Sequence, residues 1–147
     1  MTTHARLTPS EDLNRRLLRA RDAIDRDYAK PLDIPALARI ALVSEFHFIR
    51  SFRETFGETP HRYLQRRRVE RAMALLRETD RSVTEICLDV GFTSLGTFSR
   101  TFRAIVGASP TEYRRRAPSH GAVPTCFAKR WTRPVSNFGE ARAARGA

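Results

Sequence analysis

The stretch SEFHFIRSFRETFGETPHRYLQRRR, residues 44–68, returns as SLGTFSRTFRAIVGASPTEYRRR at residues 94–116. The two copies align at an offset of 50 residues. Their shared identities include Phe48 with Phe98, Arg50 with Arg100, Phe52 with Phe102, Arg53 with Arg103, Gly57 with Gly107, Pro60 with Pro110 and Tyr63 with Tyr113. Shared apolar positions indicate shared packing, and an Arg at a fixed distance from each Phe indicates a shared task.

The apolar spacing around both copies is helical, and no run alternates apolar and polar residues long enough to predict a strand. Each copy has the pattern of a helix, a tight turn, a second helix closed by Gly, and a Pro that starts another helix. We therefore predict an all-α fold with two helix-turn-helix subdomains, homeodomain-like three-helix units, joined by a long helix. The predicted ranges are 9–116 for the whole domain, 33–57 for the first unit, 60–79 for the linker helix and 82–107 for the second unit.

Local signals place the helix starts. A first helix is expected from Pro9 and Ser10 and is ended by Pro31. Asp33, Ser44 and Ser82 are predicted N-caps, because their side-chain oxygens can accept hydrogen bonds from free backbone N–H groups. Residues 117–147 form a Pro- and Gly-rich basic tail with no periodic apolar stripe.

The charge of the chain points to an acidic partner. It has 147 residues, 27 basic against 16 acidic, and a formal net charge of +11. All but two of the basic residues are Arg, whose planar fork matches phosphate and guanine edges. No apolar run is long enough to span a membrane, and the start lacks an apolar signal-peptide core. We therefore expect nucleic acid as the partner, no membrane, and a cytoplasmic, nucleoid-associated protein.

The second helix of each copy presents Arg opposite its aromatic stripe. On a helical wheel, Phe48 and Phe52 lie about 160° and 200° from Arg50, whereas Phe46 and Arg53 lie within about 60° of it. In the second copy the outward residues include Gly96, Thr97, Arg100 and Arg103. The Phe stripes are expected to be core, and the outward Arg residues are expected to contact DNA.

That chemistry fits a helix in the major groove of double-stranded DNA. Arg50 and Arg100 can each donate two hydrogen bonds to guanine O6 and N7, worth about 1–3 kcal/mol of discrimination. Phe46 could contact a thymine methyl group or pack against a neighbouring helix; both readings stay open. Arg53 and Arg103 lie one turn further along, where phosphate contact is expected.

Two different reading helices on one chain predict an asymmetric site and make a monomer sufficient. If the joining helix spans about 18 residues it is about 27 Å long, close to the roughly 34 Å between successive major grooves.

The repeat and its surroundings resemble the DNA-binding domain of AraC/XylS-type transcription regulators over about residues 12 to 116. The resemblance rests on the F-x-R-x-F-R cores, the pair Gly91–Phe92 and the two G-x-x-P-x-x-Y segments. It implies a bacterial transcription regulator, an activator in most members, that binds promoter DNA and contacts RNA polymerase. No room is left for an effector domain, so the short stand-alone, MarA/SoxS-like members are the expected kin.

The resemblance also assigns residues. It implies base contacts from Phe46, Ile49, Arg50, Leu95, Gly96 and Arg100, and phosphate contacts from Thr97 and Arg103; from the helix face we add His47 and Arg53 as phosphate contacts. Leu95 and Gly96 depart from residues that are usually polar in the family. The second helix is therefore expected to read little beyond Arg100.

The sequence gives less support to other functions. The four histidines have no metal-ligand spacing and no catalytic constellation is visible, so we expect no enzyme, no metal and no cofactor. In an alternative interpretation, the chain is a DNA-binding module whose tail is a redox or alkylation sensor. Cys126 would be the reactive residue, because its basic neighbours Lys129 and Arg130 could lower the pKa of its thiol. The tail aromatics Phe127, Trp131 and Phe138 either fold back onto the helical core, which is the favoured interpretation, or form a docking strip for a partner protein. Cys87 is expected to be a small buried residue.

Overall fold

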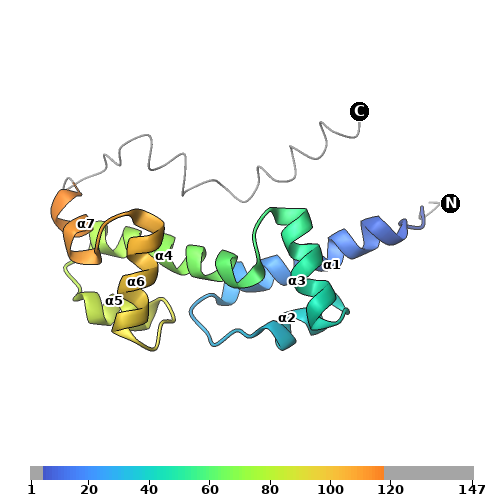
Figure 1. Ribbon diagram of the computed structural model, residues 1–147, viewed down its shortest axis with the longest axis horizontal. Helices are drawn as coiled ribbons and strands as arrows, with labels where there is room; N and C mark the ends of the chain where they lie inside the picture. Colours follow the sequence, from blue (N-terminus) through green and yellow to red (C-terminus); the bar gives the residue numbers. More distant parts are fainter. Residues whose placement is uncertain (1–4, 118–147) are drawn as a thin grey trace. The chain divides into compact units, whose positions relative to one another are not determined.

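The computed structural model describes residues 5–117, and that part of the chain is all helical (Figure 1). The helices are α1 (Pro9–Asp27), α2 (Ile34–Ala41), α3 (Glu45–Phe56), α4 (Pro60–Glu78), α5 (Val83–Asp89), α6 (Leu95–Val106) and α7 (Pro110–Arg116). The prediction of an all-α fold is confirmed.

The packing contacts divide the chain into two compact units. Unit 1 ends at Leu64 and unit 2 begins at Gln65, so the boundary falls inside α4. Unit 1 contains α1, α2, α3 and the first turn of α4. Unit 2 contains the rest of α4 with α5, α6 and α7.

The core of unit 1 is built around a string of aromatic rings. Phe48 and Phe52 on α3 are fully buried and their ring centroids lie 5.6 Å apart. Phe52 also meets Tyr63 at 5.8 Å, in an edge-to-face arrangement that aromatic rings prefer. The Tyr63 hydroxyl donates a hydrogen bond to Asp25 Oδ1 on α1 at 2.7 Å. Leu17 and Ile24 on α1 complete the buried face.

Unit 2 repeats this core with one change of partner. Phe98 and Phe102 are buried with centroids 5.7 Å apart, and Phe102 meets Tyr113 at the same distance. The Tyr113 hydroxyl, however, accepts a hydrogen bond from Arg77 Nη1 at 2.5 Å, where the first copy donates to a carboxylate. The repeated Phe residues are thus core, as expected.

Helix α1 begins at the predicted residue, Pro9, and ends before Pro31, as expected. The N-cap is Thr8, which forms a capping box with Glu11, so the helix begins at Pro9. The helix stops at Asp27, and Pro31 disfavours the α conformation at Lys30, so the helix cannot continue through the proline.

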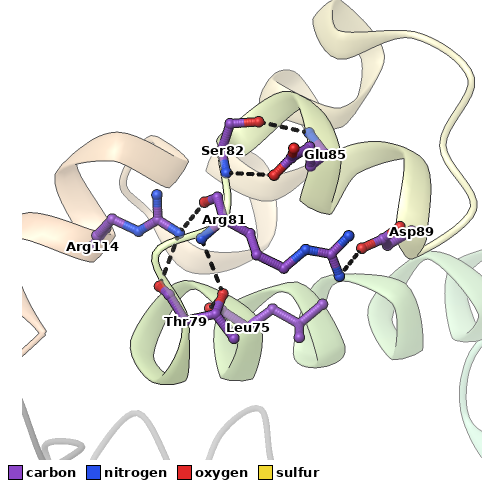
Figure 2. Close-up of polar contacts among 7 residues, drawn as sticks. All are labelled: Leu75, Thr79, Arg81, Ser82, Glu85, Asp89 and Arg114. Atoms are coloured by element: carbon purple, nitrogen blue, oxygen red, sulfur yellow. Dashed lines mark hydrogen bonds and ion pairs between the residues drawn. The ribbon is translucent and has the colours of Figure 1, made fainter.

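The connection from α4 to α5 is held by Arg114 of α7 (Figure 2). Its guanidinium donates to the carbonyls of Leu76 at 3.2 Å, Thr79 at 3.3 Å and Arg81 at 2.5 Å. The Arg81 side chain forms an ion pair with Asp89 at the end of α5. Of the three acceptors, Leu76 lies in the last turn of α4, where carbonyls have no partner within the helix, and Thr79 and Arg81 lie in the connection itself.

Candidate nucleic-acid interface

The orientation of α3 follows from its caps and its aromatic stripe. Ser44 Oγ accepts a hydrogen bond from the backbone N–H of His47 at 3.2 Å, which fixes the start of the helix. Gly57 closes the helix at φ +82°, in the left-handed region that favours glycine. With Phe48 and Phe52 buried, the opposite face is directed away from the core of unit 1.

That opposite face carries the residues predicted to read bases. Phe46 is 75% exposed and Ile49 is 37% exposed, so both apolar side chains are accessible on this face. Arg50 and Arg53 are also exposed, and His47 is half-buried. The second expectation for Phe46, packing against a neighbouring helix, does not fit so exposed a ring.

Arg50 lies between an aromatic ring and a carboxylate on the same helix. Its guanidinium carbon is 5.9 Å from the centroid of the Phe46 ring, within the range of a cation–π contact. Its Nε is 4.0 Å from Glu54 Oε1, one turn further along. The two contacts constrain the Arg50 side chain while leaving it accessible. Glu54 is not among the residues predicted from the sequence, although its i, i+4 spacing from Arg50 indicates such a contact.

In unit 2, α6 is the counterpart of α3 and exposes the second set of predicted residues. Ser94 Oγ accepts from the backbone N–H of Thr97 at 3.3 Å and caps the helix. Leu95 is 45% exposed and Gly96, Thr97, Arg100 and Arg103 are exposed as well. A Cβ at Gly96 would meet only Ser94 Oγ, at 3.7 Å, so the fold does not require glycine there.

The structure therefore gathers the predicted residues on two exposed helix faces, one in each unit. Each face has an Arg at the equivalent helical position. Arg50 follows Phe46 and Ile49 on α3, and Arg100 follows Leu95 and Gly96 on α6. The first face adds an exposed aromatic ring and an acid, and the second face adds neither. A helix with this layout can bring its N-terminal half to base edges in a major groove.

Within residues 5–117, no group of three or more His, Cys, Asp or Glu side chains could hold a metal ion, and no helix of that range is long and apolar enough to cross a membrane. Cys87 is buried, and burial raises the pKa of its thiol above the usual range.

The predictions for Cys126 and for Phe127, Trp131 and Phe138 lie outside the described residues and stay predictions.

Comparison with known proteins gives a consistent result. A family model described as a helix-turn-helix domain matches residues 37–116. The regulatory protein SoxS of Salmonella typhimurium is 36% identical over 93 residues, which is 63% of this chain and 87% of SoxS. The probable transcriptional regulator LumQ of Photobacterium leiognathi is 31% identical over 91 residues, which is 62% of this chain but 37% of LumQ.

Solved structures are similar in fold. A probable AraC family transcriptional regulator from Rhodopseudomonas palustris superposes with a TM-score of 0.64 at 28% identity, covering 70% of this chain and 97% of the other. The DNA-binding domain of the global transcriptional factor AdpA, solved in complex with a target DNA, gives a TM-score of 0.61 at 28% identity, covering 84% and 98%.

Proposed function

This chain belongs to the AraC/XylS-type helix-turn-helix family of DNA-binding transcription regulators, and from that premise we propose that it reads an asymmetric promoter site with two recognition helices. These helices are α3 and α6. Each enters one of two adjacent major grooves, so a single chain covers both elements of the site.

The observation that carries the proposal is the repeated exposed Arg. Arg50 and Arg100 occupy equivalent positions on α3 and α6. The opposite face of each helix is buried through its own pair of phenylalanines, Phe48 and Phe52 or Phe98 and Phe102. A guanidinium presented in this way can donate two hydrogen bonds to one guanine. Arg53 and Arg103 follow one turn later and are exposed, where they can contact phosphate.

We expect α3 and α6 to contribute unequally to recognition of the DNA sequence. Around Arg50, the exposed rings and chains of Phe46 and Ile49 offer apolar contact to thymine methyl groups. Around Arg100, Leu95 and Gly96 offer little hydrogen-bonding capacity. We therefore assign more sequence information to the first element than to the second.

His47 and Thr97 complete the proposed phosphate contacts. Both lie in the first turn of their helices, His47 on α3 and Thr97 on α6, where the backbone N–H groups and the helix dipole also favour an anion. These contacts would hold the helices in register without reading sequence.

We propose further that binding activates transcription through contact with RNA polymerase. The support is the family resemblance, since most AraC/XylS-type members act in this way. A reporter gene downstream of the selected site would rise in expression with the protein present; an unchanged or reduced output would overturn the activator role alone.

The test of two-helix reading is selection of bound sequences from a random duplex pool by the wild-type chain, Arg50→Ala and Arg100→Ala. The wild type should enrich two elements about one helical turn apart. Arg50→Ala should relax the first element and Arg100→Ala the second, each by about 1–3 kcal/mol of base discrimination.

Arg19→Ala is the matched control, because it removes one exposed positive charge from α1 and leaves both recognition helices intact. It should enrich the same elements as the wild type. Enrichment of no sequence by the wild type, with binding that only fades as salt rises, would contradict the proposal.

A further inference from the structure

The turn between α2 and α3 contains a leucine in a left-handed conformation. Leu42 has φ +57° and ψ +39°, and it is the one non-glycine residue with positive φ within residues 5–117. Such a conformation brings Cβ of an L residue too close to its own backbone. Its side chain is 72% exposed, so burial of the leucine does not compensate.

The second helix-turn-helix has glycine, Gly91, at the equivalent position of its turn. In the first turn Leu42 N–H bonds to the Arg39 carbonyl and Val43 N–H to the Ala38 carbonyl, at 3.1 and 3.2 Å. In the second turn Gly91 and Phe92 make the equivalent pair of bonds, both at 3.1 Å. This is one helix-ending motif used twice, and the residue at its left-handed position is normally glycine.

A side chain from α1 holds the leucine turn. Arg16 Nη1 donates to the Ala41 carbonyl at 2.7 Å and to the Leu42 carbonyl at 3.3 Å. Its Nε donates to Asp12 Oδ2 at 3.1 Å, one helical turn earlier on α1. The Arg16 side chain is only 19% exposed, so these charge-assisted bonds form partly out of water. They also satisfy carbonyls at the C-terminal end of α2.

The position of this turn matters for the proposed contacts. Ser44, the N-cap of α3, follows Leu42 by two residues, and Phe46 and Arg50 lie in the first two turns after the cap. The direction in which α3 leaves the turn therefore depends on the backbone angles of Leu42.

We infer that Arg16, oriented by Asp12, is a positioning residue for the first recognition helix. It holds Leu42 in a conformation that glycine adopts unaided, and so fixes where α3 presents Phe46 and Arg50. The inference rests on the proposed function, because its consequence is measured as reading of the first DNA element.

The experiment is a double-mutant cycle of Arg16→Ala and Leu42→Gly, with two duplexes. One duplex is the sequence selected by the wild type, and the other has the first element scrambled. Arg16→Ala should bind the intact duplex about tenfold more weakly, the effect of losing about one charge-assisted hydrogen bond, and the scrambled duplex as the wild type does.

Leu42→Gly alone should bind both duplexes like the wild type. The double variant should recover the intact-duplex affinity to within about threefold, because glycine needs no clamp at this position. A purely stabilising Arg16 would lower affinity for both duplexes together, and glycine at 42 would not restore it.

Arg15→Ala is the matched control, an exposed arginine on the same helix. It should leave both affinities unchanged. If Arg16→Ala binds the intact duplex as well as the wild type does, the inference is overturned. Should Arg16→Ala fail to fold, the double variant decides: a folded protein with first-element reading supports the inference, and an unfolded one overturns it.

Failure of the proposed function would look different. There the wild type itself would not distinguish the intact duplex from the scrambled one.

Discussion

At the scale of single residues, substitution of Gly96 is expected to have opposite effects on the stability of the fold and on the proposed binding of DNA. Gly96 lies in the first turn of α6, φ is not positive, and a Cβ would have room. Gly96→Ala should therefore raise the free energy of unfolding by about 0.5–1 kcal/mol. The same methyl group would stand between α6 and the groove, so affinity for the selected duplex should fall by about threefold or more. Urea unfolding and fluorescence-anisotropy binding measure the two effects.

Gly107→Ala supplies the contrast for this prediction. Gly107 has φ +87°, so alanine there should lower the free energy of unfolding by about 1 kcal/mol. If Gly96→Ala stabilises the protein and leaves DNA affinity unchanged, Gly96 is outside the interface.

At the scale of elements, each of the two proposed recognition helices, α3 and α6, begins at a serine cap. Ser44→Ala and Ser94→Ala each remove the acceptor for a backbone N–H in the first turn of α3 or α6. Each should lower the free energy of unfolding by about 1 kcal/mol, and the two losses should add because the caps lie in separate units. Ser99→Ala, a serine-to-alanine change inside α6, should have no such cost. Equal effects of all three substitutions in chemical denaturation would contradict the capping account.

The sequence predicted the elements well because their starts depend on local chemistry. Asp33, Ser44 and Ser82 are the observed caps, and the repeated Phe stripes are buried. The turn at Leu42 could not be predicted, because a leucine argues against a left-handed residue and the compensating Arg16 lies 26 residues away.

The tertiary partners of the repeated residues could not be predicted from the repeat. The aligned residues Tyr63 and Tyr113 have opposite hydrogen-bonding roles, one toward Asp25 and one toward Arg77. A repeat pattern carries no information on such partners, which come from segments outside the aligned copies.

At the scale of the whole molecule, charge is distributed unevenly between the units. Residues 5–64 have eleven basic and nine acidic side chains, an excess of two, whereas residues 65–117 have eleven and six, an excess of five. Nonspecific attraction to phosphate rises with such an excess. We therefore predict that residues 65–117 contribute more of the nonspecific attraction to DNA than residues 5–64 do.

The central claim is that one chain reads two elements, and the most direct test is the mass of its complex with the selected duplex in sedimentation. We predict one chain per duplex, with affinity falling when either element is scrambled. Two chains per duplex, bound independently to the two elements, would contradict the claim.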